Sequence, residues 1–294
     1  MQILKIFILV LINAGGEGKT TIARLIRVIL QLSSCKHLGL DADHGSFALM
    51  DSSGEDLLTK KVGWSVGPDK AVEIVQVAGH LPVIMDTGAS MLASQRDIVD
   101  LLPVLRKRFS ERGYRTVALL PISPNKIAAP GALADLAPKL NDFETFVVRN
   151  DRDGSGEFGD VTKAYPEIAV HHLAPGLNAY LTRSKSSIID AMLFPKPGYV
   201  KAAAYIADWV RLFAEEPQVQ GLLGANTVQI AIQRLPAQPP PLRFVLETYD
   251  CVNDEAIARN EYMTHIMRLI DQHTWSVAGL RGAADELERC PPVL

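Results

Sequence analysis

Hydrophobic positions recur along most of the chain in two alternating patterns. Short apolar runs, typical of strands buried on both faces of a parallel sheet, alternate with longer stretches whose apolar residues have helical spacing. The pattern predicts strands over 3–12, 36–40, 81–85, 115–122, 143–149 and 167–173. It predicts helices over 20–32, 69–78, 95–111, 128–140 and 201–215. We therefore expect an α/β fold, a mostly parallel sheet with helices on both faces.

The composition changes near residue 225. No lysine follows Lys201, and prolines 239–241 resemble a stiff connector. We therefore expect a nucleotide-binding domain over 1–224 and a small C-terminal appendage of unknown role over 225–294. Within the appendage, the pattern is consistent with strands over 227–235 and 244–249 and an amphipathic helix over 254–271.

Composition and charge exclude several classes of protein. The 294 residues are 48% hydrophobic and 21% charged, as in globular proteins, and three widely spaced cysteines argue against a disulfide framework or a zinc ribbon. The net charge of −3 leaves DNA binding possible but unsupported. The apolar run 6–12 is shorter than the roughly 20 residues that span a bilayer. We expect a soluble, cytoplasmic protein that makes no membrane contact.

The strongest chemical signal lies between the first predicted strand and the first helix. Residues 13–21 read Asn-Ala-Gly-Gly-Glu-Gly-Lys-Thr-Thr, in the strand–turn–helix context of a phosphate-binding loop. The glycines allow backbone N–H groups to converge on an anion, Lys19 would reach the β- and γ-phosphates, and the Thr20 hydroxyl would ligate Mg²⁺. The expected nucleotide-binding residues are Gly15, Gly16, Glu17, Gly18, Lys19, Thr20 and Thr21. The alternative is a glycine turn with a solvated lysine.

Aspartates follow two of the other predicted strands. Asp41 and Asp43 end the second strand, and Asp86 ends the strand over 81–85. Ligands of open α/β sheets bind beyond the carboxyl ends of the strands, where these carboxylates can approach one metal and one phosphate group. The alternative is that they cap ordinary turns.

The phosphate loop resembles the deviant loop of the ParA/MinD family of P-loop ATPases, K-G-G-x-G-K-[ST]. Residues 41–46 resemble the family's switch I motif, D-x-D-P-Q-G, with His44 and Gly45 in place of Pro-Gln. Residues 82–90 resemble its Walker B or switch II segment, and 146–151 resemble the late strand whose terminal asparagine recognises adenine. The resemblance covers about residues 1–216. Ala14 stands where the family has a lysine.

The resemblance implies a Mg²⁺- and ATP-binding protein. Lys19 and Asp43 would be catalytic, with Asp43 positioning the attacking water. Thr20, Asp41 and Asp86 would hold the metal, and Asn150 would bind adenine unless it is a simple turn residue. In the family, the lysine replaced here by Ala14 reaches the partner's phosphates in a nucleotide-sandwiched dimer.

The family further implies an ATP-dependent homodimer and a protein partner. The carboxylate segments most resemble those of plasmid conjugal-transfer members of the TraL type, with chromosome or plasmid partition as the next candidate process. Because the dimer lysine is missing, we expect at most weak ATP hydrolysis. Two other functions remain open: a nucleotide-binding adaptor with little turnover, and a P-loop kinase or ligase-type synthetase that acts on a small molecule.

Overall fold

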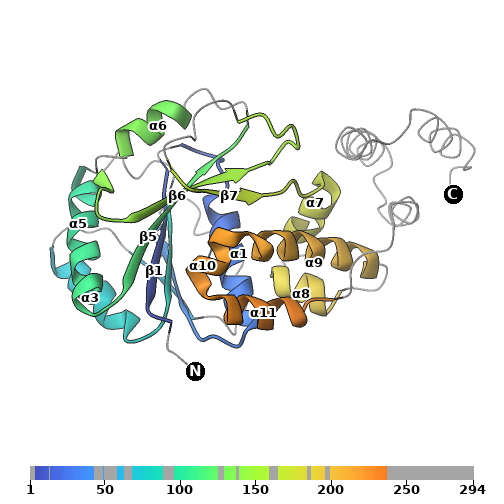
Figure 1. Cartoon of the computed structure of the whole chain (residues 1–294), viewed down its shortest axis with the longest axis horizontal. Coiled ribbons are helices and arrows are strands. Elements are labelled where there is room, and N and C mark those ends of the chain that lie inside the picture. The colour runs from blue at the N-terminus through green and yellow to red at the C-terminus, as the bar shows by residue number, and fades with distance from the viewer. Residues whose placement is uncertain are drawn as a thin grey trace, which may run out of the picture.

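The strands of the chain form one parallel sheet (Figure 1). The computed structural model describes residues 4–12, 14–42, 49, 58–62, 68–88, 96–124, 129–136, 139–158, 165–183, 187–195 and 199–236. The strands are β1 (Ile6–Val10), β2 (Leu38–Ala42), β3 (Thr59–Lys61), β4 (Val83–Thr87), β5 (Arg115–Ile122), β6 (Glu144–Asn150) and β7 (Glu167–Val170). Their order in the sheet is β3-β2-β4-β1-β5-β6-β7, which confirms the predicted α/β class.

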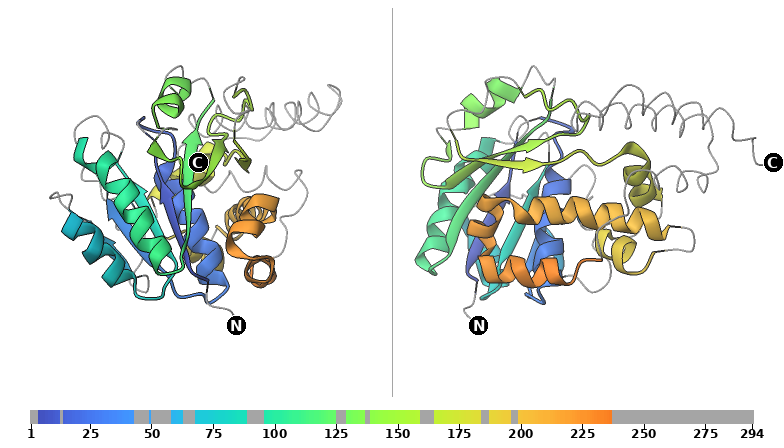
Figure 2. Two further views of the ribbon diagram at one scale, coloured as in Figure 1. Left: turned by 60° about the vertical axis from the view of Figure 1, so that its left-hand side comes forward. Right: turned by 45° about the vertical axis from the view of Figure 1, so that its right-hand side comes forward.

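Helices cover both faces of the sheet (Figure 2). One face carries α1 (Lys19–Leu32), α7 (Pro175–Arg183), α8 (Ile188–Leu193), α9 (Val200–Glu215), α10 (Pro217–Leu223) and α11 (Ala225–Gln233). The other face carries α3 (Pro68–Ala78), α5 (Arg96–Glu111) and α6 (Ala129–Leu136). The sheet is therefore the middle layer of three.

The central strand β1 shows why both faces are apolar. Its side chains alternate between the two faces, as in any strand. Ile6 and Ile8 join the core beneath α1, whereas Phe7 and Leu9 join the core beneath α3 and α5. Phe7 also stacks on Phe109 of α5, with ring centroids 4.2 Å apart. The continuous apolar run in the sequence is thus explained by burial on both sides.

The connectivity places the glycine-rich loop after β1 at the carboxyl end of the central strand of the sheet. After β1 the chain builds β2, β3 and β4 on one side, and then crosses to place β5 on the other side of β1. The carboxyl end of β1 is therefore a topological switch point, the position at which open α/β sheets bind ligands.

Several predicted elements need correction. The strand predicted over 227–235 is wrong, because these residues belong to helix α11 and the turn after it, with Val228 and Ala231 buried in the core that contains α1. Spacing of three between these residues suits a helix. The strand predicted over 167–173 ends at Val170, and the helix predicted over 128–140 ends at Leu136. The segments 244–249 and 254–271 lie outside the described residues.

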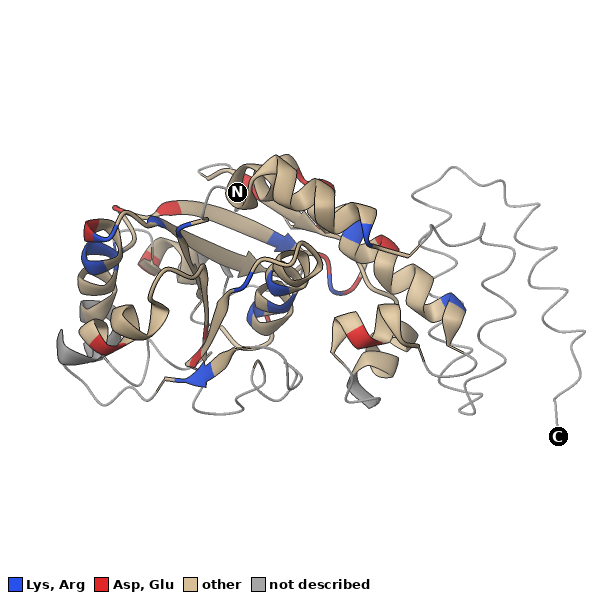
Figure 3. Cartoon of the chain, turned by 90° about the horizontal axis from the view of Figure 1, so that it is seen from below, with Lys and Arg blue, Asp and Glu red and all other residues tan. Residues whose placement is uncertain are grey.

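The described part of the chain carries charges of both signs. Basic and acidic residues are interspersed along the described ribbon (Figure 3). Of the helices that the structure describes, none has the length and apolar character needed to cross a membrane.

Candidate functional site

The loop between β1 and α1 has the backbone geometry of an anion-binding turn. Gly16 and Gly18 adopt positive φ angles of 76° and 90°, a conformation that glycine adopts without a steric penalty. Gly18 is the N-cap of α1, and it provides no side-chain cap to the first backbone N–H groups of the helix. The first turn also contains no acidic residue. The N–H donors and the positive end of the helix dipole are therefore suited to an anion.

Lys19 folds back onto the start of this loop. Its Nζ donates to the backbone carbonyl of Ala14 over 2.8 Å and to that of Ile12 over 3.3 Å. The residue is only 7% exposed. These contacts place a positive charge inside the loop, where it would face a bound phosphate. Thr20 and Thr21 follow in the first turn of α1 and are half-buried.

The end of β6 supports the loop from the other side. Asn150 Nδ2 donates to the backbone carbonyl of Glu17 over 2.9 Å. A Cβ atom on Gly18 would lie 2.0 Å from this nitrogen, so the contact also requires glycine at position 18. Arg152, two residues beyond, donates to the Gly16 carbonyl. Asn150 has a second N–H and a carbonyl oxygen, and its role toward adenine remains a prediction.

Glu17 contributes more than its backbone. Its side chain is fully buried, and Oε2 accepts a hydrogen bond of 2.7 Å from the backbone N–H of Ser123, just after β5. Oε1 has no hydrogen-bond partner among the described residues. The sequence motif identified Glu17 as a loop position, whereas its role in joining the loop to β5 depends on the tertiary structure.

Asp41 and Asp86 lie side by side near the carboxyl ends of their strands. They are register partners on the neighbouring strands β2 and β4, and both are at most 1% exposed. Thr87 fixes the adjacent strand ends, because its Oγ1 donates to the Val10 carbonyl over 2.9 Å. The sequence predicted that each aspartate ends its strand, and the structure places each of them one residue before the end of its strand.

Both aspartates share the sheet face that α1 covers. The alternate positions Leu38, Leu40 and Ala42 of β2, and Val83 and Met85 of β4, belong to the opposite core. Side chains alternate along a strand. Asp41 and Asp86 therefore project toward α1 and the phosphate loop, as a metal-binding role requires.

The charges of these carboxylates act on two arginines of α1. Burial lowers the pKa of Arg24, and the charges of Asp86 and then Asp41 raise it. Burial also lowers the pKa of Arg27 to about 10, partly offset by the charge of Asp41. Sequence reasoning assigned no role to either arginine. Their spacing from Thr20, at i+4 and i+7, was the available signal, since it places all three on one helix face.

Arg27 is fixed by contacts with β2 and β3. Arg27 is 2% exposed, and its Nη2 donates to Thr59 Oγ1 over 2.8 Å. A Cβ atom on Gly39 would lie 2.6 Å from Arg27 Cζ, so the guanidinium packs directly on the β2 backbone. This contact independently confirms that α1 faces the side of β2 that carries Asp41.

The donor set fits a magnesium nucleotide better than a metal alone. Among the described residues, no group of three or more His, Cys, Asp or Glu side chains could hold a metal ion. Mg²⁺ commonly uses one or two carboxylates together with substrate phosphates and water. Thr20, Asp41 and Asp86 offer such a partial set. Asp43, the predicted water-positioning residue, lies outside the described residues, as do His44 and Gly45.

Comparison with known proteins gives structural likenesses only. No protein-family model and no curated protein matches the chain. The chain is similar to MinD of Aquifex aeolicus in its MinC:MinD cell division protein complex (17% identity, 70% of this chain and 94% of that chain covered, TM-score 0.46). It is also similar to a separate structure of that MinD (17%, 70% and 95%, TM-score 0.45). A nucleotide-binding protein of Archaeoglobus fulgidus in complex with ADP is similar at 14% identity, with 75% and 92% covered and a TM-score of 0.35.

Proposed function

We propose that the chain is an ATP-binding P-loop protein in which the bound nucleotide acts as a switch. One observation carries the proposal. A glycine loop at a helix N-terminus, which contains Lys19, lies at the carboxyl ends of the strands, and Asp41 and Asp86 project toward it. A cationic loop beside buried carboxylates suits a triphosphate accompanied by a divalent cation.

The residues of the site have separate roles in this proposal. The loop amides and Lys19 bind the phosphate oxygens. Thr20, Asp41 and Asp86 are the residues that would hold Mg²⁺. When bound, Mg²⁺ would neutralise phosphate charge and orient the phosphate oxygens. Asn150 keeps the loop in shape and presents its remaining amide groups toward the base.

Hydrolysis should be weak. Asp43 would orient the attacking water, but Ala14 supplies no cation where related loops have lysine. An absent transition-state cation of the arginine-finger type lowers phosphoryl-transfer rates by about 10³-fold or more. Ala14 therefore also favours the second candidate function, a nucleotide-binding adaptor with little turnover.

The biological setting follows from the motif resemblance alone. We propose a cytoplasmic protein that forms an ATP-dependent homodimer and contacts a protein partner in plasmid transfer or partition. ATP would act as a switch through its γ-phosphate contacts, as in other P-loop proteins, and would thereby change the affinity for that partner.

The decisive experiment measures ATP binding and ATP hydrolysis separately. In millimolar Mg²⁺, we expect the wild type to bind ATP, and Lys19→Ala to weaken binding by at least about tenfold because a charge-assisted phosphate contact is lost. Lys36→Ala is the matched control, since Lys36 is exposed near the other end of α1. A wild type that binds no ATP refutes the proposal. If the wild type binds ATP but neither hydrolyses it nor forms a dimer detectable by light scattering, the adaptor function is supported.

A further inference from the structure

Arg24 lies on the same face of α1 as Thr20. The two residues are four apart, and Arg27 is three further along, so the three side chains form one stripe along the helix. Arg27 contacts the β2 backbone at Gly39, which fixes this stripe against the sheet face that carries Asp41 and Asp86. Arg24 therefore lies between Arg27 and Thr20 on this helix face.

Two carboxylates at neighbouring register positions, each at most 1% exposed, need compensation by positive charge. Buried charges are otherwise costly and persist when they are paired. The charges of both aspartates act on the Arg24 guanidinium, and Asp41 also acts on Arg27. A guanidinium stays protonated under ordinary conditions. The chain therefore already holds a permanent cation at the carboxylates that a divalent cation would use.

We propose that Arg24 is a built-in counter-cation of the Asp41–Asp86 pair and weakens the binding of a divalent cation there. A Mg²⁺ ion near these carboxylates meets like-charge repulsion from the Arg24 guanidinium. Nucleotide binding in this protein consequently depends little on Mg²⁺. Arg24 acts through the two aspartates and is a positioning residue. The nucleotide part of this inference rests on the proposed function, and the part that concerns the metal alone does not.

The first test uses Mg²⁺ alone, without nucleotide. We expect about 10 mM Mg²⁺ to leave the unfolding temperature of the wild type unchanged within about 1 °C, and to raise that of Arg24→Gln by about 3 °C or more, because a ligand that binds the native state stabilises it. Arg24→Lys keeps the charge and should behave as wild type. Arg24→Gln combined with Asp86→Asn should lose the gain. Arg108→Gln removes an exposed arginine and controls for net charge.

A wild type that Mg²⁺ stabilises as strongly as Arg24→Gln overturns the proposal, and so does a folded Arg24→Gln that Mg²⁺ does not stabilise. The second test needs only wild-type protein. Removing Mg²⁺ with EDTA should weaken ATP binding by less than about tenfold, and a loss of about a hundredfold or more overturns the proposal even if Arg24→Gln fails to fold. A wild type that binds ATP neither with Mg²⁺ nor with EDTA refutes the proposed function instead. The role of Arg24 is then still decided by the first test, or by a direct measurement of Mn²⁺ binding to the wild type.

Discussion

Asn150 at the end of β6 donates a hydrogen bond to the backbone carbonyl of Glu17 across 133 residues of sequence. The same amide fills the space that a side chain on Gly18 would need. The phosphate loop is therefore shaped partly by a distant strand, and changes at the end of β6 should alter phosphate binding.

Asn150→Ala removes the donor of this bond. We expect a loss of stability of about 1–2 kcal/mol, because the buried Glu17 carbonyl loses its partner, together with weaker ATP binding. Asn150→Asp should be worse, since an acceptor then faces a carbonyl oxygen. Urea unfolding and titration calorimetry measure both effects. Wild-type stability and affinity in both variants would show that the bond does not shape the loop.

Gly39→Ala tests the contact between β2 and Arg27. The new methyl group would overlap the buried guanidinium, because a Cβ atom at this position would lie 2.6 Å from Arg27 Cζ. Arg27 must move from its bond with Thr59, and we expect a destabilisation of about 1–3 kcal/mol in denaturant unfolding.

Gly221→Ala is the matched control for Gly39→Ala. Gly221 is an exposed residue of α10, and a Cβ atom there meets no atom within 4 Å. The same substitution should stabilise the protein by about 0.5–1 kcal/mol through helix propensity. Equal effects of the two substitutions would contradict the packing of Arg27 on β2.

His37 should make stability depend on pH. Burial lowers its pKa from 6.5 to about 4; a hydrogen bond with the Cys35 carbonyl opposes this shift, and the charge of Arg27 adds to it. Since the unfolded chain takes up the proton first, the native state is at full stability above pH 6.5 and loses stability as pH falls toward 4. The loss attributable to His37 should total about 3 kcal/mol.

The measurement compares unfolding free energies at about pH 7 and about pH 4.5 in wild type, His37→Gln and His80→Gln. His37→Gln should lose less stability on acidification than wild type. His80 is exposed, so His80→Gln should keep the wild-type dependence on pH. An unchanged pH dependence in His37→Gln would show that His37 is protonated normally in the native state.

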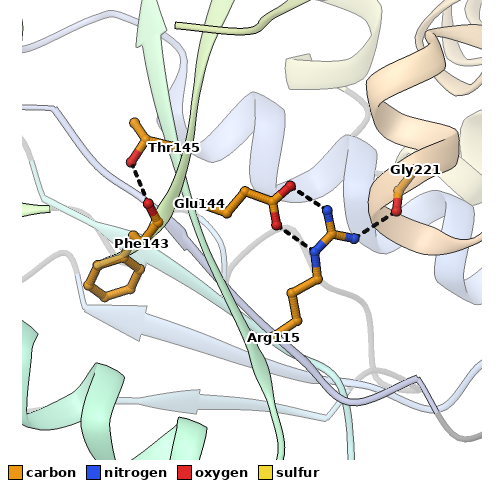
Figure 4. A network of polar contacts seen from close by, with 5 residues as sticks. All are labelled: Arg115, Phe143, Glu144, Thr145 and Gly221. Atoms are coloured by element: carbon orange, nitrogen blue, oxygen red, sulfur yellow. Dashed lines mark hydrogen bonds and ion pairs between the residues drawn. The ribbon is translucent and has the colours of Figure 1, made fainter. Parts of the chain in front are cut away.

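Arg115 links the first residues of β5 and β6 to helix α10 (Figure 4). These residues lie at the amino ends of the strands, whereas the glycine-rich loop follows the carboxyl end of β1. Its Nε donates to Glu144 Oε2 over 2.6 Å, and its Nη1 donates to the Gly221 carbonyl over 2.7 Å. Both charged side chains are partly exposed. A double-mutant cycle with Arg115→Gln and Glu144→Gln should give a coupling of about 0.5–1 kcal/mol without changing ATP binding. A lower ATP affinity in these variants would show that the contacts of Arg115 affect the nucleotide site.

The residue pattern alone was sufficient to predict the α/β class, the position of the glycine-rich loop and the strands that carry Asp41 and Asp86. These features are local: an apolar run, a glycine-rich turn and a helical pattern each arise within about a dozen neighbouring residues. The strand predicted over 227–235 failed because alternation and helical spacing are ambiguous in a short apolar stretch, and packing of α11 against α1 decided the outcome.

The proximity of the charged side chains, by contrast, depends on how distant segments pack together. Arg24 and Arg27 are ordinary helix residues in the sequence, and Asp41 and Asp86 are 45 positions apart. Parallel pairing of β2 with β4 brings the two carboxylates together, and the packing of α1 on the same face supplies their counter-charges. The contact of Asn150 with Glu17 likewise depends on strand order. Such contacts follow from the register and packing of distant segments, which no local pattern of residues encodes.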